Sequence, residues 1–256
     1  MMLEFRHVSY TYPAQQSAAI QDLSFSVLPG EFVGILGAND SGKTTLAKLC
    51  NGLLPASDGE ILVNGQCVGR DIDVRQARRK IGVVFSDPEN QIVGTTVEED
   101  IAFGLGNLCV PPEEMRRRID RILDRVGLRE YALREPHRLS GGEQQKLCLA
   151  SVLAMQPECL VLDAPLTFLD SASRAEMLTM LQNLHAEGST LLYCTSEPDE
   201  LIKAERILVL RAGKLLADTA PSDLWNDATI LEQAAIQPSN LMLLQQALHK
   251  HAEKNL

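Results

Sequence analysis

Eight consecutive residues combine two glycines, a lysine and a threonine at a spacing that suits phosphate binding. They are Gly37, Ala38, Asn39, Asp40, Ser41, Gly42, Lys43 and Thr44, which match the pattern G-x-x-x-x-G-K-[ST]. In such a loop the backbone N–H groups surround anionic phosphates, the lysine reaches the terminal phosphates and the threonine hydroxyl ligates Mg²⁺. The motif predicts a nucleoside triphosphate site but does not name the reaction, because kinases, GTPases and ATPases share it.

A second motif lies about a hundred residues later. It comprises Leu139, Ser140, Gly141, Gly142 and Glu143, and it opens an apolar run that continues to Met155. As the N-terminus of a helix, it offers a serine hydroxyl and glycine N–H groups to an anion. The same letters also fit an ordinary capping box, with serine as N-cap and glutamate at the third helical position. Taken alone, the motif favours the cap.

The elements around these motifs alternate between strand-like and helix-like patterns. Before the first motif lies the apolar run Phe32–Leu36, and a helical pattern starts at Lys43. The region from Val97 to about Met155 is mostly helical, and strand and helix alternate again after it. This order favours a largely parallel sheet flanked by helices, with an antiparallel portion at the start. The predicted strands are Leu3–Val8, Leu23–Val27, Phe32–Leu36, Gly59–Val63, Ile81–Phe85, Cys159–Leu162, Thr190–Cys194, Arg206–Leu210 and Lys214–Ala217.

Composition excludes several classes of protein. The 256 residues include 45% hydrophobic and 23% charged residues, which are ordinary globular proportions. The formal net charge of −10 argues against broad attraction to nucleic acid. No apolar run is long enough to cross a bilayer, and the N-terminus lacks a signal-peptide pattern. Six scattered cysteines without a C-x-x-C pair are interpreted as reduced structural thiols.

The two motifs, together with Leu160-Val161-Leu162-Asp163, closely resemble the ABC ATPase family over nearly the whole chain. The resemblance implies an α/β fold: a P-loop NTPase (RecA-like) core with an N-terminal antiparallel β portion and an inserted α-helical signature subdomain. We expect an ABC ATPase domain over residues 1–228, with its core at 1–88 and 156–228 and the helical subdomain at about 89–155. Residues 229–256 are expected to form a C-terminal helical extension.

The resemblance also assigns roles to single residues. ATP and Mg²⁺ are the implied ligands. Tyr12 is implied to stack on adenine, although the sequence also allows a plain surface or core aromatic. Thr45 follows Thr44 in the implied binding loop. Thr44 and Asp163 are implied Mg²⁺ partners, with a simple turn at the strand end as the alternative for Asp163. Asp170 is implied to be the D-loop residue at a dimer interface, and Leu139–Glu143 to complete a nucleotide site in trans.

Within that family, two stretches resemble the ATPases of energy-coupling factor importers, which carry cobalt, nickel or vitamins. They run from Val84 to Gln91 and from Thr96 to Gly104. The resemblance implies a transmembrane coupling subunit, contacted through about Phe85–Gly104, and indirectly a substrate-binding membrane subunit. It also implies a peripheral position on the cytoplasmic face of the membrane. A generic loop of another ABC importer remains the alternative.

The chain departs from the family pattern at four positions. Ala164 stands where a glutamate follows the Mg²⁺-linked aspartate, Ser196 where a histidine contacts the γ-phosphate, and Ser86 where a loop glutamine is usual. Gln91 lies five residues beyond Ser86 and is not taken as its substitute. The fourth position is Asp40, which replaces a glycine that is common in relatives and brings a negative charge near the phosphates. An alanine methyl cannot accept a proton from the attacking water.

These departures, beside an intact signature motif, predict a chain specialised for a heterodimer with a second ABC ATPase. Its own site would bind nucleotide but turn it over slowly or not at all. Two alternatives are kept, namely a nucleotide-gated scaffold with no role in transport and an active homodimeric ATPase.

The arginine-rich run Glu113–Arg125 is interpreted as a solvated helix face, not a nucleic-acid patch, because acidic residues alternate with its arginines. The apolar spacing of Asn240–Lys250 fits packing on the same domain or on the partner ATPase.

Overall fold

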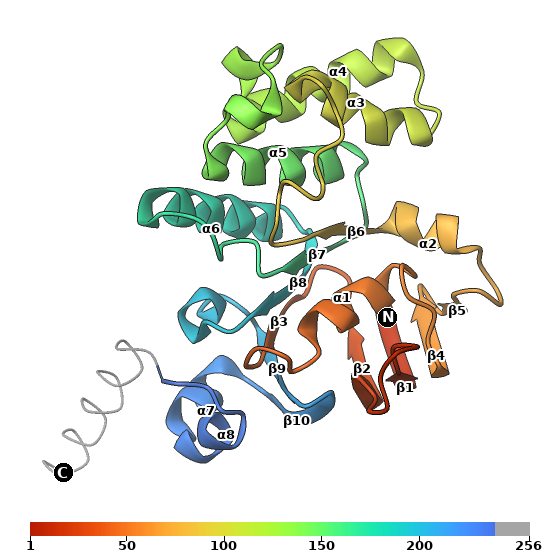
Figure 1. The fold of residues 1–256 in the computed structure, drawn as a ribbon, viewed down its shortest axis with the longest axis vertical. Coiled ribbons are helices and arrows are strands. Elements are labelled where there is room, and N and C mark those ends of the chain that lie inside the picture. The colour runs from red at the N-terminus through yellow and green to blue at the C-terminus, as the bar shows by residue number, and fades with distance from the viewer. Residues whose placement is uncertain (239–256) are drawn as a thin grey trace, which may run out of the picture.

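Parallel pairing organises the larger of two β-sheets in the computed structural model, which describes residues 1–238 (Figure 1). Its order is β10-β9-β3-β8-β7-β6, and every pair is parallel except β9 with β10. Strands β3, β7 and β8 are buried along their whole length, as expected for a parallel sheet covered on both faces. The strands are β3 Phe32–Leu36, β6 Ile81–Val84, β7 Cys159–Asp163, β8 Thr190–Thr195, β9 Arg206–Arg211 and β10 Lys214–Thr219.

The smaller sheet is antiparallel and has the order β2-β1-β4-β5. Its strands are β1 Leu3–Tyr10, β2 Ile20–Val27, β4 Asp58–Val63 and β5 Gln66–Cys67. Helix α1 (Lys43–Cys50) packs between the two sheets, because one hydrophobic cluster joins its Leu46 and Leu49 to Phe5 of β1 and Ile35 of β3. The helix that follows the phosphate motif is thus held from both sides.

A separate group of helices lies beyond the larger sheet, at the top of Figure 1. Helices α3 (Val97–Asn107), α4 (Pro112–Val126) and α5 (Gly141–Ala154) share a hydrophobic cluster of their own. Helix α6 (Ser171–Ala186) lies between α5 and the sheet, and it packs in a second cluster with β7 and β8. The remaining elements are α2 Val74–Lys80, the short 3₁₀ helices Arg129–Tyr131, Pro136–Arg138 and Pro198–Leu201, α7 Pro221–Asn226 and α8 Ala228–Gln233.

The fold class predicted from the sequence is confirmed, including the antiparallel portion at the start and the helical block between β6 and β7. The predicted strands Arg206–Leu210 and Lys214–Ala217 are present as the antiparallel pair β9 and β10, with positive φ at the turn residues Ala212 and Gly213. Helix α2 was not predicted. It buries only Ala77, so its sequence VRQARRK carries almost no apolar periodicity.

The positions of the cysteines agree with their interpretation as reduced structural thiols. All six are free thiols, five of them are buried, and Cys109 is exposed. Burial raises the pKa of Cys148 and of Cys159 to about 12, so both stay neutral in the core.

No helix within residues 1–238 is long and apolar enough to span a membrane. Helix α8 spans the predicted boundary at residues 228 and 229, while residues 239–256, including Asn240–Lys250, lie outside the described part of the chain.

The buried carboxylate of Asp100 connects the loop after β6 to the helical block through hydrogen bonds. Asp100 on α3 is buried, and its Oδ1 accepts hydrogen bonds from the N–H groups of Val93 and Gly94 at 2.8 and 3.0 Å. Its Oδ2 accepts a bond from the Ser151 hydroxyl of α5 at 2.6 Å. Asp100 therefore joins the loop, α3 and α5.

Replacing this carboxylate tests the junction. Asp100→Ala leaves three donors without their acceptor, and we expect it to lower the free energy of unfolding by roughly 2–3 kcal/mol. Thermal denaturation of the full chain measures the effect. The neighbouring exposed Glu99→Ala serves as control, with a change below about 1 kcal/mol. Equal effects for the two variants would contradict the assignment of a joining role to Asp100.

Candidate nucleotide site

The phosphate motif forms the turn between β3 and α1, and its glycines are required by close packing. A Cβ at Gly37 would lie 2.3 Å from the Ser41 hydroxyl oxygen and 2.8 Å from the carbonyl oxygen of Leu210. Gly42 is the N-cap of α1, with φ of 105°. The loop can therefore approach an anion with its backbone, as the motif predicts.

Lys43 is buried beneath this loop. Its Nζ donates hydrogen bonds to the carbonyl oxygens of Gly37 and Ala38 at 2.7 and 2.8 Å. Burial lowers the pKa of Lys43, and the nearby charges of Asp163 and Asp40 oppose that shift. The ammonium group thus lies at the centre of the turn, where it can contact a phosphate.

Thr44 and Asp163 lie together although they are far apart in sequence. Asp163 ends β7 and is buried, and burial raises the pKa of its carboxyl group, whereas a hydrogen bond with Thr44 and the charge of Lys43 oppose the rise. Hydroxyl and carboxylate oxygens are ligands that Mg²⁺ prefers. Residues 1–238 contain no cluster of three or more His, Cys, Asp or Glu that could hold a metal alone. Mg²⁺ is commonly bound by one or two protein groups plus substrate phosphates, and Thr44 and Asp163 offer two such groups.

An aromatic ring lies beside the first turn of α1. The Tyr12 hydroxyl is 3.2 Å from Oγ1 of Thr45, and its ring meets that of Tyr10 edge to face, with centroids 4.9 Å apart. Tyr12 is half-buried, so one part of the ring faces outward. The ring can therefore contribute to a stacking surface next to the phosphate loop.

A cavity of about 780 Å³ unites most of the predicted residues. Its walls come from the carboxyl ends of the parallel strands, where ligands of open α/β sheets usually bind. The predicted residues in its lining are Tyr12, Asn39, Asp40, Gly42, Lys43, Thr44, Thr45, Ser86, Asp163, Ala164 and Ser196. The three positions that depart from the family pattern after β6, β7 and β8 thus face the same cavity as Lys43.

Those three positions bring short side chains to the cavity. Ala164 has a φ of 49°, and its N–H donates to the carbonyl oxygen of Cys194 at 2.8 Å. Gln91 does not replace Ser86, because its side-chain amide is bonded to the backbone of Phe85 in both directions, at 2.8 and 2.9 Å. Neither histidine nor glutamate occurs among the described residues that line the cavity.

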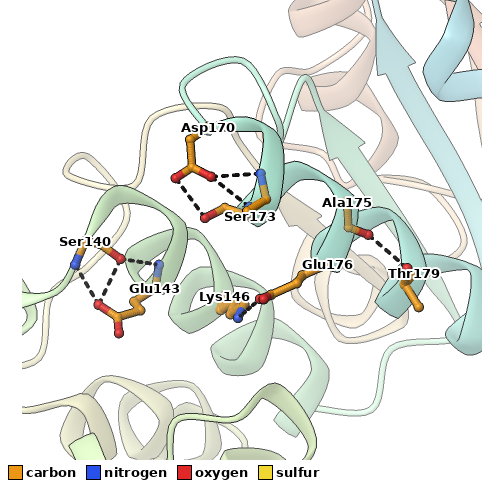
Figure 2. Close-up of polar contacts among 9 residues, drawn as sticks. Ser140, Glu143, Lys146, Asp170, Ser173, Ala175, Glu176 and Thr179 are labelled. Atoms are coloured by element: carbon orange, nitrogen blue, oxygen red, sulfur yellow. Dashed lines mark hydrogen bonds and ion pairs between the residues drawn. The ribbon is translucent and has the colours of Figure 1, made fainter.

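The signature motif lies outside this cavity. Ser140 is the N-cap of α5, its Oγ accepts a bond from the N–H of Glu143 at 3.3 Å, and the Glu143 carboxylate accepts from the N–H of Ser140 at 2.7 Å. Ser140 and Glu143 are drawn with these hydrogen bonds in Figure 2. The capping box considered from the sequence is therefore present, and it does not exclude anion binding by the outward face of the same turn. Asp170 likewise caps α6.

Sequence reasoning missed part of the lining. Other lining residues come from the connection between β1 and β2 (Gln15, Ser17, Ala18 and Ala19), from the start of β2 (Gln21) and from two later loops (Thr167 and Ala212). No motif marks these residues, since their place depends on how the antiparallel sheet packs on α1.

A buried acidic network beside Ser196 was also missed. Glu200 accepts hydrogen bonds from the hydroxyls of Tyr193 and Thr195 at 3.0 and 2.7 Å and pairs with Arg174 at 2.9 Å. Burial raises the pKa of Glu200, while these hydrogen bonds oppose the shift. The guanidinium of Arg174 also donates to the carbonyl oxygen of Leu166 at 3.3 Å, so the network joins the loops that follow β7 and β8. Arg174 lies 26 residues before Glu200 in the sequence, and no motif links the two.

Comparisons with known proteins show which proteins the chain is similar to. A family model described as ABC transporter matches residues 20–167. A curated protein of Methanosarcina acetivorans, named energy-coupling factor transporter ATP-binding protein EcfA, is 40% identical over 250 residues, 98% of this chain and 90% of that protein. A cobalt import ATP-binding protein CbiO of Syntrophus aciditrophicus is 40% identical over 235 residues, which cover 92% and 84% of the two chains.

Solved structures agree with these relatives. The structure of cbiO1 from Clostridium perfringens, described as part of the ABC transporter complex cbiONQ, superimposes with a TM-score of 0.80 at 28% identity. The match covers 96% of this chain and 98% of that chain. The ATP-binding cassette MJ0796, solved as a dimer in a post-hydrolysis state with ADP and Pi, gives a TM-score of 0.78 at 28% identity, with 86% and 99% covered.

The charge at Asp40 can be tested separately from its backbone conformation. Asp40 is exposed at the rim of the cavity and has a φ of 62°. We expect Asp40→Asn, which tolerates this conformation, to tighten MgATP binding about three- to tenfold because a negative charge near the phosphates is removed. Titration with a fluorescent ATP analogue measures the affinity.

Two controls accompany that measurement. Asp40→Glu keeps the charge and should bind no more tightly than the parent chain, and Lys43→Ala should bind far more weakly. The gain for Asp40→Asn should shrink at high salt, because ions screen exposed charges. An unchanged affinity for Asp40→Asn at low salt would contradict an electrostatic role for Asp40.

Proposed function

The chain belongs to the ABC transporter family, and on that premise we propose that it is the ATP-binding subunit of an energy-coupling factor importer for cobalt or a vitamin. The names of its relatives support the class of importer, since proteins 40% identical over nearly the whole chain are called energy-coupling factor and cobalt import ATP-binding proteins. The site supports ATP as ligand through Lys43, Thr44 and Tyr12, which share one cavity.

The proposed membrane partner is supported by a surface on the helical side. Val93 and Phe103 are large apolar residues that stay 61% and 56% exposed, on either side of the Asp100 junction. Val93 stands in the chain between Ile92 and Gly94, which help to line a groove of about 620 Å³. Exposed apolar side chains around a groove are typical of a protein interface. We therefore place the coupling subunit at Phe85–Gly104 and the chain itself at the cytoplasmic face of the membrane.

The proposed chemistry of the chain's own site follows from Ala164. When bound, Mg²⁺ would neutralise phosphate charge and be held by Thr44 and Asp163. Lys43 and the loop N–H groups would bind the phosphates. The methyl group of Ala164 offers no acceptor to orient a water molecule, and Ser196 is too short to act as a histidine would. This cavity has its binding groups present but no carboxylate at Ala164 and no imidazole at Ser196, and that is the single observation that carries the proposal of a catalytically impaired site.

The proposed partner ATPase follows from the position of the signature motif. Ser140 and Gly141 are exposed, and neither lines the cavity of their own chain. A head-to-tail pair would bring this turn to the nucleotide of the partner, where its N–H groups could stabilise anionic charge. If the partner retains the glutamate and histidine, hydrolysis at that composite site resets a dimer that nucleotide binding closes. The heterodimer therefore needs this chain even though its own site is impaired.

Restoring the missing carboxylate tests the impairment. We expect the chain alone to bind ATP with little turnover, and Ala164→Glu to raise its steady-state ATPase rate by roughly 10- to 100-fold, because a positioned base commonly contributes 10² or more. Ala164→Gln is the matched control, similar in size but without a base, and it should stay near the parent rate. Brisk hydrolysis by the unchanged chain would instead favour an active homodimer.

Mixing experiments test the heterodimer. We expect ATPase activity when the chain is combined with the ATPase encoded next to it, and a loss of at least tenfold when this chain carries Ser140→Arg, which blocks the anion-binding turn. Ser140→Asp keeps an N-cap acceptor but repels phosphate, so it should lose activity as well. Thr179→Arg on the exposed face of α6 is the control and should retain it. Full activity with both Ser140 variants would refute a role in trans, and a mixture in which the chains never associate would favour the non-transport scaffold.

A further inference from the structure

A chain of hydrogen bonds connects the phosphate loop with the loop that follows β8. Thr195 ends β8, and its carbonyl oxygen accepts a bond from the N–H of Gly37 at 3.2 Å. Its hydroxyl donates to Oε2 of Glu200 at 2.7 Å and accepts from the N–H of Glu197 at 3.0 Å. Ser196, which lines the cavity, lies between Thr195 and Glu197. Its place is therefore fixed relative to the first glycine of the phosphate loop.

Arg174 of α6 extends this chain of bonds to the loop that follows β7. One terminal nitrogen of its guanidinium donates to Oε1 of Glu200 at 2.9 Å, and the other donates to the carbonyl oxygen of Leu166 at 3.3 Å. Leu166 stands two residues after Ala164 and directly before Thr167, and both of these line the cavity. The planar fork of an arginine suits two acceptors at fixed positions. One side chain thus bridges the loops after β7 and β8.

The bridge depends on a buried carboxylate that is paired at both oxygens. The side chain of Glu200 is only 7% exposed. Its Oε1 accepts from Arg174, and its Oε2 accepts from the hydroxyls of Tyr193 and Thr195. Removing one partner of a buried ion pair is costly, because the remaining charge loses its compensation. Glu200 therefore holds the guanidinium of Arg174 in one place.

The two bridged loops border the part of the cavity that would receive the terminal phosphate. The loop after β7 begins directly beyond Asp163, which with Thr44 offers oxygen ligands to Mg²⁺. In nucleotide sites of this kind the metal contacts the terminal phosphates. Tyr12 lies elsewhere, in the connection between β1 and β2. A change in the spacing of the two loops should therefore affect the third phosphate and leave the rest of the nucleotide in place.

We infer that Arg174 is a positioning residue for the terminal phosphate of a bound nucleotide. By bridging Glu200 and Leu166, it sets the spacing of the loops that carry Ala164 and Ser196, and with it the preference of the site for a triphosphate over a diphosphate. Within residues 1–238 the lining of the cavity does not include Arg174, so it acts through these loops. The inference rests on the proposed ATP site, but not on a partner ATPase or on hydrolysis.

Nucleotide affinities of the full chain test this role. Isothermal titration calorimetry with Mg²⁺ present measures the Kd of ADP and of AMP-PNP, an ATP analogue that resists hydrolysis. We expect Arg174→Met to weaken AMP-PNP binding about three- to tenfold and to change ADP binding less than about twofold. Glu200→Gln should act in the same direction, because it removes the charge that holds the guanidinium. The double variant should lose no more than the larger single loss, since both residues act through one bridge.

Arg118→Met is the matched control. Arg118 of α4 also donates to a carboxylate and to a carbonyl oxygen, those of Glu114 at 2.9 Å and Ala154 at 3.4 Å, but it is not part of the cavity lining. Both of its affinities should stay within about twofold of the parent values.

The ratio of the two affinities separates positioning from a general loss of structure. A variant that is partly unfolded loses both affinities by the same factor, because only the folded fraction binds. Equal losses for ADP and AMP-PNP in Arg174→Met, or no loss for either, would overturn the inference. A parent chain that binds neither nucleotide would refute the proposed ATP site and the inference with it.

Discussion

The structure depends on one turn, in which the backbone passes from β3 into α1 with no space for side chains at Gly37. That turn is stable because α1 is packed from both sides, against the antiparallel sheet and against the buried strands β3 and β8. Lys43 is then drawn under the loop by bonds to the carbonyl oxygens of Gly37 and Ala38. The two sheets and the helix between them thus hold an anion-binding loop open, and all other site residues are placed relative to it.

The parallel sheet explains how distant residues meet at this loop. Strands β6, β7 and β8 run side by side with β3 in register, so the residues that follow each strand reach the same edge. Ser86, Ala164 and Ser196 occupy those places. Their convergence is a consequence of topology, and it explains why changes at three separated positions affect one site. The helical block is joined to the loop after β6 by Asp100 and contributes no residue to the lining of the cavity.

Much of this arrangement could be predicted because its signals are local. The phosphate motif, the strand before it and the helix after it lie within about twenty residues, and the period of the apolar pattern changes at the turn. The resemblance implied that Tyr12 and Asp163 belong to the nucleotide site, and the structure places both in the lining of the cavity. What could not be predicted depends on contacts between distant elements. The lining from the connection between β1 and β2 and the association of Arg174 with Glu200 leave no periodic or motif signal in the chain.

The backbone conformation at Ala164 explains how the loop keeps its shape at a site that we propose to be impaired. A positive φ is unfavourable for alanine by about 1–2 kcal/mol relative to the right-handed region, and glycine or asparagine would adopt it more easily. The conformation is maintained because the N–H of Ala164 is bonded to Cys194 and its carbonyl oxygen accepts a bond from the Thr167 hydroxyl at 3.0 Å. The loop therefore keeps its shape, and only the side-chain chemistry is reduced. On the proposal above, the loop keeps the geometry that binds ATP, and a bound nucleotide still favours the closed dimer without being hydrolysed.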